Sequence, residues 1–281
     1  MSPPPQPYEL AGAAALALRR RLPQAPAAVV VMGSGWGDAE SHFGELEATV
    51  AAESLPGFPE PTAPGHTGAV RVHRLGRRLV LVLSGRVHLY EGHPAATVVH
   101  GVRTAVLAGA GTVVLSNAAG ALRAELPVGR PTMIADQLNL TGTSPLVGPP
   151  PPPPHAGRFL EMGGLYDLGL RRRLREIDPS IREVTYAGVL GPQFETPAEV
   201  SMLAGMGADV VGMSTVLEAI AAHHLGARVL GLSLVTNLAA GLSPQPVSAD
   251  DVLEVGRSSA SELGRLLVEF LANLEAAGEL G

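Results

Sequence analysis

Residues 28–37 read AVVVMGSGWG, an apolar, β-branched run that passes directly into a glycine-rich turn. An apolar run without polar alternation is typical of a strand buried on both faces, so Ala28–Met32 is predicted to be such a strand. The glycines that follow let the backbone approach an anion, and Ser34 can donate a hydroxyl. The sixth position is Asp38 rather than glycine, so this is not a dinucleotide fingerprint, and a plain tight turn remains an equal alternative.

The same pattern of apolar run, turn and helical periodicity recurs along the chain. The predicted buried strands are Ala28–Met32, Leu79–Leu83, Thr112–Leu115, Thr132–Ala135, Val184–Val189, Asp209–Val211 and Val229–Val235, and Ala69–Leu75 alternates as a half-exposed or edge strand does. The predicted helices are Glu9–Arg21, Ala95–Ala108, Tyr166–Ile177, Pro197–Met206, Leu217–Leu225 and Ala249–Ala276. We therefore predict an α/β fold, a single domain over residues 1–281 with a central mixed β-sheet flanked by helices on both faces.

Six consecutive prolines at residues 149–154 interrupt this pattern. Such a run adopts an extended polyproline conformation and fits neither a helix nor a sheet. We predict a stiff surface loop, with a ligand for an SH3-type domain as the less favoured alternative.

Composition excludes several classes of chemistry. The chain has no cysteine and no lysine, which removes thiol nucleophiles, disulfides, P-loop lysines and Schiff bases. Its net charge of −6 and lack of basic runs disfavour nucleic acid, and no apolar stretch is long enough to cross a membrane. No metal site and no cofactor is expected. The N-terminus does not resemble a secretory signal, so a cytoplasmic location is expected.

Polar residues follow the predicted strands where ligands bind in open α/β sheets. After Leu83, the residues Arg86, His88 and Tyr90 project to one side if the backbone is extended. Arginine offers a planar donor fork for phosphate, and histidine adds a donor. A solvated edge with ordinary polar side chains is the alternative.

Other strand ends carry small or polar residues. Residues 116–120 (SNAAG) are predicted as a turn whose amides close on a ligand or merely pack. Phe194 and Glu195 suit a flat heterocycle, because one stacks while the other accepts N–H bonds. Ser214 lies at a predicted helix N-terminus, which favours anions, and Asn237 follows the most apolar strand. His223 and His224 are adjacent on a helix and are expected to be structural or surface residues.

These segments together resemble the trimeric purine nucleoside phosphorylases, a family related to the methylthioadenosine phosphorylases. The resemblance lies in MGSGWG, LPGFPEPTAPGHTG, SGRVHLYEGH, VVLSNAAGAL, GPQFETPAE, GMSTVLE and VTNLAAG, in this order along most of the chain. It implies phosphorolysis of inosine, guanosine and their 2′-deoxy forms to a free base and pentose 1-phosphate, in purine salvage. It also implies a homotrimer that needs no cofactor and uses inorganic phosphate as co-substrate.

The resemblance also implies a role for individual residues. Phosphate would be surrounded by Ser34, His66, Arg86, His88, the Ala118 amide and Ser214. The base would contact Phe194, Glu195 and Asn237, and the ribose would contact Tyr90, Met213 and Phe159 of a neighbouring subunit. Asn237, Glu195 and His88 are the predicted catalytic residues.

One departure keeps an alternative open. Many relatives carry a histidine near the start of the C-terminal helix, where this chain has Ala249. A 5′-methylthioadenosine phosphorylase is therefore the alternative within the fold, although that family usually has aspartate in place of Asn237. A nucleoside hydrolase and a non-catalytic purine-binding protein are the alternatives from other classes.

Overall fold

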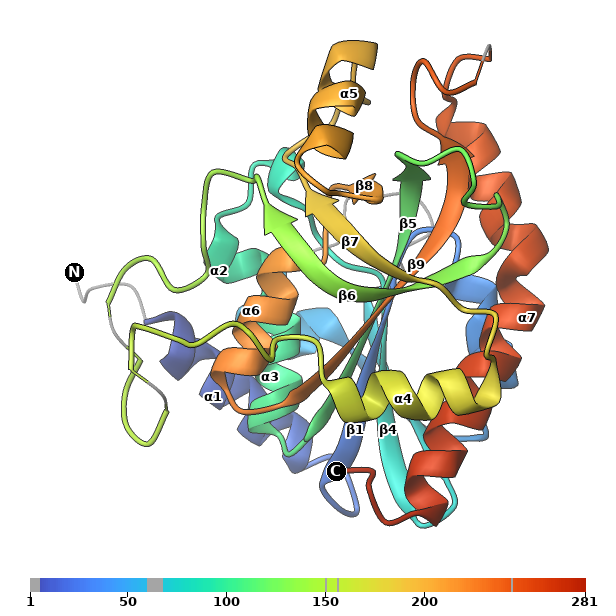
Figure 1. The fold of residues 1–281 in the computed structure, drawn as a ribbon. Helices are drawn as coiled ribbons and strands as arrows, with labels where there is room; N and C mark the ends of the chain where they lie inside the picture. Colours follow the sequence, from blue (N-terminus) through green and yellow to red (C-terminus); the bar gives the residue numbers. More distant parts are fainter. Residues whose placement is uncertain (1–5, 60–67, 150, 156, 244) are drawn as a thin grey trace.

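The computed structural model describes residues 6–59, 68–149, 151–155, 157–243 and 245–281 (Figure 1). In this part of the chain nine strands form one mixed sheet in the order β2-β3-β4-β1-β5-β8-β7-β6-β9. The strands are β1 (Pro26–Met32), β2 (Glu45–Ala51), β3 (Ala69–Leu75), β4 (Arg78–Ser84), β5 (Thr112–Ala121), β6 (Pro131–Asn139), β7 (Glu183–Gly188), β8 (Val210–Gly212) and β9 (Arg228–Leu238). Because β9 pairs with both β6 and β5, strands β5 to β9 close into a ring.

Helices cover both faces of this sheet (Figure 1). They are α1 (Pro7–Arg19), α2 (Ala95–Val98), α3 (His100–Leu107), α4 (Leu168–Ile177), α5 (Pro197–Gly205), α6 (Val216–His224) and α7 (Ala249–Ala276). Side chains of β1 alternate between two cores: Val29 and Val31 pack with α1, α3 and α6, whereas Val30 packs with α4 and α7. The apolar run that opens the chain's first motif is therefore buried on both faces, as predicted.

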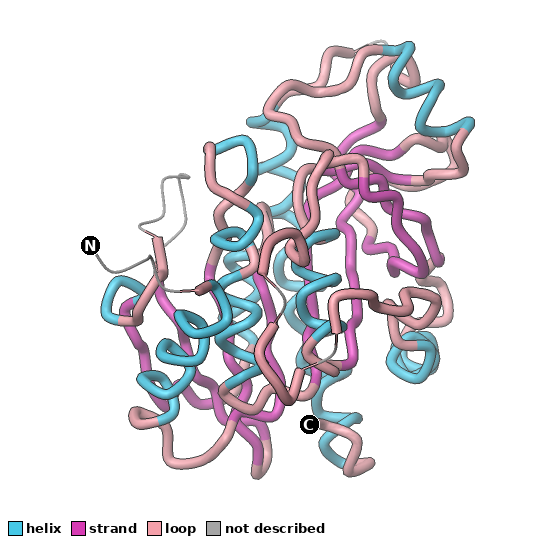
Figure 2. The backbone as a smooth tube through the Cα atoms, turned by 90° about the vertical axis from the view of Figure 1, so that its left-hand side faces the viewer, coloured by secondary structure: helices cyan, strands magenta, loops and turns pink. Residues whose placement is uncertain are grey.

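The predicted α/β class is confirmed, and several parallel strands end on the same side of the sheet. β4 and β5 pair in parallel with β1, and β9 pairs in parallel with β5. Their carboxyl ends therefore meet at the same end of the sheet, which brings Gly33, Gly85 and Asn237 into one region. In Figure 2 the helix α5 and its flanking loops stand clear of the layers at this end.

Two sequence predictions about strands are wrong. The predicted turn at residues 116–120 is strand, because β5 stays paired with β9 as far as Ala121, opposite Leu238. The pairing with β9 gives the backbone of these small residues its hydrogen-bond partners. The edge strand β2 was not predicted, since its residues are mostly exposed and carry three polar side chains in seven (ELEATVA).

The other predicted helices and strands hold with small changes. Ala69–Leu75 is half-exposed, but it is not an edge strand, because β3 pairs with both β2 and β4. The predicted helix 95–108 is two helices, with a break at Val99. The described prolines of residues 149–154 lie in a loop and are mostly exposed. None of the helices in the described ranges is both long and apolar enough to span a membrane.

Candidate active site

Arg86 is the buried cation at the carboxyl end of β4. Its Nη1 donates to the Ser214 hydroxyl at 3.0 Å, and its Nε lies 3.4 Å from a carboxylate oxygen of Glu218. Its Nη2 is buried and has no hydrogen-bond partner among the described residues. An unsatisfied donor on a buried guanidinium is costly unless an acceptor arrives, so this geometry favours an anionic ligand.

The N-terminal turn of α6 holds the partners of Arg86. Thr215 caps the helix, and its amide donates to Glu218 at 3.1 Å. Among the described residues Thr215 is the one non-glycine with a positive φ, 71°, a conformation that costs about 1–3 kcal/mol for a β-branched residue. Burial raises the pKa of the Glu218 carboxyl, against the opposing effect of the Arg86 guanidinium. The strained turn thus fixes Ser214 and Glu218 on either side of one guanidinium.

The glycine-rich turn after β1 is tied to β5. The amide of Gly33 donates to the Ser116 hydroxyl at 3.0 Å, and the Trp36 indole donates to the Asn117 carbonyl at 2.9 Å. A Cβ at Gly33 would clash with the Ser116 carbonyl oxygen, so the close approach requires glycine. Asn117 in turn donates to the Thr215 hydroxyl at 2.8 Å. The turn that carries Ser34, the strand β5 and the cap of α6 therefore form one connected unit.

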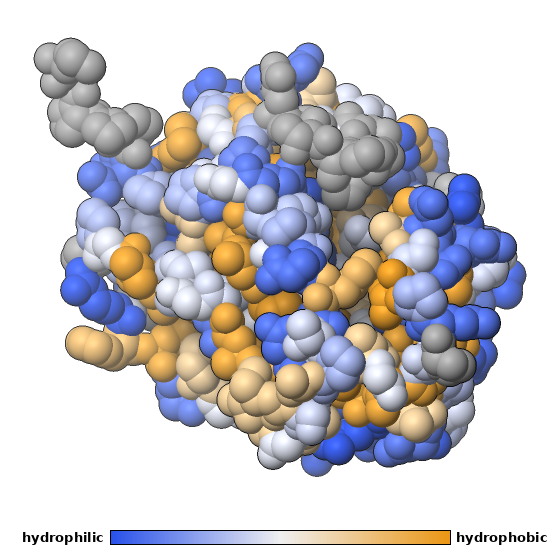
Figure 3. Space-filling view, turned by 90° about the horizontal axis from the view of Figure 1, so that it is seen from above, coloured by the Kyte–Doolittle hydropathy of each residue, from blue (hydrophilic) through white to orange (hydrophobic). Residues whose placement is uncertain are grey.

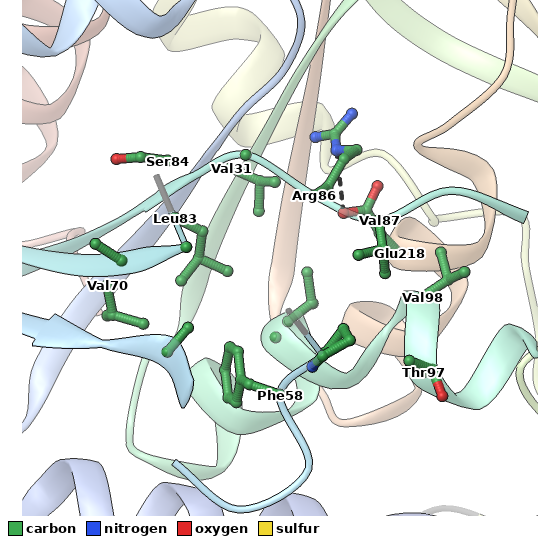
Figure 4. Close-up of a pocket in the computed structure, with 17 residues that line it drawn as sticks. Val31, Phe58, Val70, Leu83, Ser84, Arg86, Val87, Thr97, Val98 and Glu218 are labelled. Atoms are coloured by element: carbon green, nitrogen blue, oxygen red, sulfur yellow. Dashed lines mark ion pairs between the residues drawn. The ribbon is translucent and has the colours of Figure 1, made fainter. Parts of the chain in front are cut away.

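An apolar pocket borders this unit (Figure 4). Its walls include Val31, Phe58, Val70, Leu83 and Val98, and Arg86 and Glu218 close one side. In Figure 4 the Arg86 guanidinium points away from these apolar side chains and toward the strand ends. Low polarity on one side strengthens the attraction between Arg86 and an anion on the other.

His88 and Tyr90 continue the segment after β4. The His88 Nδ1 and its main-chain amide both lie within hydrogen-bond distance of a Glu91 carboxylate oxygen, at 3.0 and 2.7 Å. The rings of His88 and Tyr90 stack with centroids 4.7 Å apart. Burial and the nearby Glu91 raise the pKa of the Tyr90 hydroxyl, so it is neutral and can donate. His88, Ser34, Arg86, Asn117, Ser214, Thr215 and Glu218 are called the phosphate side below, after the ligand that the family resemblance implies for this group.

A second group of residues faces outward from the same end of the sheet. Phe194 is 42% exposed, and the half-buried Glu195 side chain has no hydrogen bond to another described residue. Burial raises the pKa of the Glu195 carboxyl, and the nearby Glu199 carboxylate adds to the rise. Figure 3, which views the molecule from this end, shows exposed apolar residues among polar ones.

Asn237 stands on β9, half-buried and held in one orientation. The Thr236 hydroxyl donates to its Oδ1 at 2.9 Å, and its Nδ2 donates to the Leu238 carbonyl at 3.1 Å. An amide nitrogen has two N–H groups, so one remains for a ligand. Phe194, Glu195 and Asn237 are called the base side below.

Comparison with known proteins decides the family. Residues 26–272 match the sequence profile of the Phosphorylase superfamily. The chain is 49% identical to a purine nucleoside phosphorylase of Mycobacterium tuberculosis over 96% of its own length and 98% of the relative's. The chain belongs to the purine nucleoside phosphorylase family.

Other members of the family agree in sequence and in fold. Purine nucleoside phosphorylase 1 of Bacillus subtilis is 36% identical, with 93% of this chain and 97% of the relative covered. A crystal structure of the Schistosoma mansoni purine nucleoside phosphorylase in complex with adenosine superposes with a TM-score of 0.87 and 30% identity, covering 94% and 96% of the two chains.

The structure brings together most of the residues that the family resemblance selects. Ser34, Arg86, His88 and Ser214 lie on neighbouring strand ends and the α6 cap, and Met213 packs against Gly191 of the loop that carries Phe194 and Glu195. Ala118 lies on β5, so its predicted place in a turn is wrong, and its carbonyl faces Gly212. Asn237 likewise lies within a strand rather than after one.

The structure does not describe one of the predicted residues, and it places another apart from the rest. His66 lies outside the described residues. Phe159 is 95% exposed and lines a surface hollow with Leu146, Val147 and Ile220 rather than any predicted site residue. Among the residues described here, no three His, Asp or Glu side chains are grouped to hold a metal ion.

Sequence reasoning missed three residues that complete the site. Glu218, Asn117 and Thr236 each hold another residue by a hydrogen bond or ion pair. Thr215 and Glu218 have the spacing of a capping box, which is visible in the sequence. This pattern predicts the start of a helix, but it does not show that Glu218 pairs with an arginine. Thr236 and Asn117 adjoin or fall within quoted motifs, yet their partners depend on strand register.

Proposed function

We propose that this member of the family catalyses phosphorolysis of the 6-oxopurine nucleosides inosine and guanosine, and of their 2′-deoxy forms. The products are the free base and ribose 1-phosphate or its deoxy form. The observation that carries the proposal is the buried Arg86, whose Nη2 has no partner among the described residues and which lies between Ser214 and Glu218. Purine salvage is the metabolic setting that this reaction fits.

The phosphate side would hold the nucleophile. Arg86, the hydroxyls of Ser34 and Ser214, the Ala118 amide, His88 and His66 would donate to a phosphate dianion. One phosphate oxygen forms a bond to the anomeric carbon of the sugar while the bond from that carbon to N9 of the purine breaks. The negative phosphate also stabilises positive charge that develops on the sugar.

The base side would receive the electron pair of the broken bond. Asn237 would donate its free N–H to N7 as the purine becomes negative. Thr236 supports this role, because its hydroxyl occupies Oδ1 and leaves the amide nitrogen to the ligand. Phe194 would lie against the flat ring.

Glu195 would select the purine. The ionised carboxylate accepts the N1–H of a 6-oxopurine, whereas adenine presents a lone pair at N1 and leaves acceptor against acceptor. A site built around such a group rejects an analogue that cannot pair by ~10⁴ or more.

The ribose would be enclosed by more than one chain. Tyr90 and Met213 would contact the sugar, and Phe159 of a neighbouring copy would cover it in a homotrimer. The nearly full exposure of Phe159 in a single chain supports a partner at this position. Inorganic phosphate as co-substrate, no cofactor and a cytoplasmic location complete the proposal.

A substrate panel tests the assignment. Base release is measured from inosine, guanosine, adenosine and methylthioadenosine at saturating phosphate. We expect rapid hypoxanthine and guanine release and slow adenine release. Comparable rates for inosine and adenosine would contradict the role of Glu195, and preference for methylthioadenosine would replace the proposed function by its alternative.

A further inference from the structure

A second buried polar cluster lies between α1, α3 and the C-terminal end of α6. At its centre is Arg103 of α3, which is 1% exposed. Its guanidinium carbon lies 4.3 Å from the centre of the Tyr8 ring, and its Nη2 donates to the Tyr8 hydroxyl at 3.3 Å and to the Pro145 carbonyl at 2.7 Å. The described residues offer Arg103 no carboxylate partner, so a ring face and a carbonyl oxygen stabilise its charge. Arg103 thus holds the first residues of the long loop that follows β6.

The cluster continues from Tyr8 to the same loop. The Tyr8 hydroxyl lies 3.1 Å from Nδ1 of His224, and Nε2 of His224 lies 3.3 Å from the Gly157 carbonyl. A carbonyl only accepts, so Nε2 carries the proton and Nδ1 accepts from Tyr8. The hydrogen bonds then form a series in which each group donates to the next, from Arg103 to Tyr8, from Tyr8 to His224, and from His224 to the main chain of the loop.

The anchors flank one residue of the loop. Gly157 precedes Phe159 by two residues, and Glu161, whose carbonyl lies 3.0 Å from Nε2 of His223, follows it by two. Arg158 donates to the Gly148 carbonyl at 2.8 Å, which joins the loop's two arms. An apolar ring that is 95% exposed is therefore carried on a main chain tied down on both sides.

The anchoring helix also serves the phosphate side. Ser214 directly precedes the N-cap Thr215, Glu218 lies in the first turn of α6, and the last two residues of α6 are His223 and His224. This nine-residue helix thus connects the partners of Arg86 to the anchors of the loop that carries the exposed ring.

We propose that Tyr8, Arg103, His223 and His224 are positioning residues that hold Phe159 in place to cover the ribose in the site of a neighbouring copy of this chain. The proposal rests on the proposed function, and none of the four residues touches substrate. Substitution of these residues should therefore change the nucleoside KM, and only because it displaces Phe159.

Tyr8→Phe is the mildest variant that breaks the chain of donors. It keeps the ring against Arg103 and His155, and removes only the hydroxyl between Arg103 and His224. We expect the nucleoside KM to rise about three- to tenfold, as for loss of one buried hydrogen bond, with kcat and the phosphate KM unchanged. His224→Ala should do the same, and His224→Gln should restore part of the loss because its amide can donate to Gly157.

A double-mutant cycle in the full-length enzyme tests the route. Phe159→Ala alone should raise the nucleoside KM about tenfold or more, and adding Tyr8→Phe to it should have no further effect. Tyr166→Phe is the matched control: it loses a buried hydroxyl bond to Gln137, 2.8 Å long, and should lower Tm without moving the nucleoside KM.

The possible outcomes separate the inference from the proposed function. A normal nucleoside KM in Tyr8→Phe, or additive effects in the cycle, would overturn the positioning role and leave the phosphorolysis assignment intact. A normal KM in Phe159→Ala would overturn the predicted ribose contact and the inference with it. Absence of phosphate-dependent cleavage in the unaltered enzyme would remove the proposed function itself.

Discussion

Arg86 and Glu195 are both candidate site residues at the same end of the sheet, yet their surroundings differ. Arg86 is buried, contacts Ser214 and Glu218, and belongs to a unit that links β1, β5 and the cap of α6. Glu195 lies on a loop beside the exposed Phe194 and makes no hydrogen bond or ion pair with another described side chain. The residues of the phosphate side are thus held in place by the fold, whereas Glu195 of the base side has no side-chain partner to hold it. Asn237 joins the two, because it belongs to the base side but stands on a strand.

The largest effect is expected from Arg86→Gln. Loss of a preorganised cation at the phosphate should lower kcat/KM about 10³-fold or more, with most of the change in the phosphate KM. Steady-state kinetics with varied phosphate would measure this, with Arg172→Gln as a control at an exposed residue of α4. A small effect would mean that the phosphate side is not centred on Arg86.

Asn237→Ala should come next. Without its N–H at N7 the departing base is not stabilised, and kcat should fall about 10²–10³-fold while the phosphate KM stays constant. The control is Asn273→Ala, which removes an exposed side-chain amide that bonds only within α7 and should leave kcat unchanged. A near-normal kcat in Asn237→Ala would contradict the role of the strand-held amide.

Glu195→Gln should cost less and should change pH dependence. We expect kcat/KM for inosine to fall about tenfold to a hundredfold. Because burial raises the pKa of Glu195 above 4.5, the carboxylate is protonated as pH falls through that raised value. Protonated Glu195 donates to N1 instead of accepting, so the ratio of inosine to adenosine turnover should fall toward acid pH.

Measuring this ratio cancels the titration of groups that affect both substrates equally. The ratio in Glu195→Gln should not depend on pH. A ratio that changes equally in the variant and the unaltered enzyme would show that another group reads N1.

The smallest effect on activity is expected from Glu40→Gln, behind the phosphate side. Glu40 lies in the short 3₁₀ turn Gly37–His42 and accepts from Arg71, His73 and Ser84 at 2.8 to 3.0 Å, which ties that turn to β3 and β4. Although burial opposes both ionised forms, these contacts lower the pKa of Glu40 below 4.5 and raise the pKa of His73 above 6.5.

The pH dependence of the Glu40 effect follows from these two shifts. The contribution of Glu40 is present above 4.5 and is lost as pH falls through its lowered pKa. The contribution of His73 is complete below 6.5 and is lost as pH rises through its raised pKa. Glu40→Gln should therefore lower the free energy of unfolding by about 2 kcal/mol near pH 5.5 and by less above about pH 8. Denaturant titrations at both values would check this, and an equal loss at both would argue against the ion pair.

Features that depend on local sequence were predicted, whereas features that depend on which elements become neighbours were not. The buried strands were predicted because a run such as AVVVM is apolar on both faces, and Arg86 followed from its place after one of them. Glu218 and Asn117 were missed, since their roles depend on which strands and helices become neighbours. The small residues at 116–120 indicate a turn, but tertiary pairing with β9 outweighs this local signal.

The most direct test of the account is the phosphate dependence of inosine cleavage by the purified protein. If Arg86 and its neighbours hold the nucleophile, hypoxanthine release should require phosphate and be matched, mole for mole, by ribose 1-phosphate. Equal cleavage in buffer free of phosphate, with free ribose as the product, would contradict it.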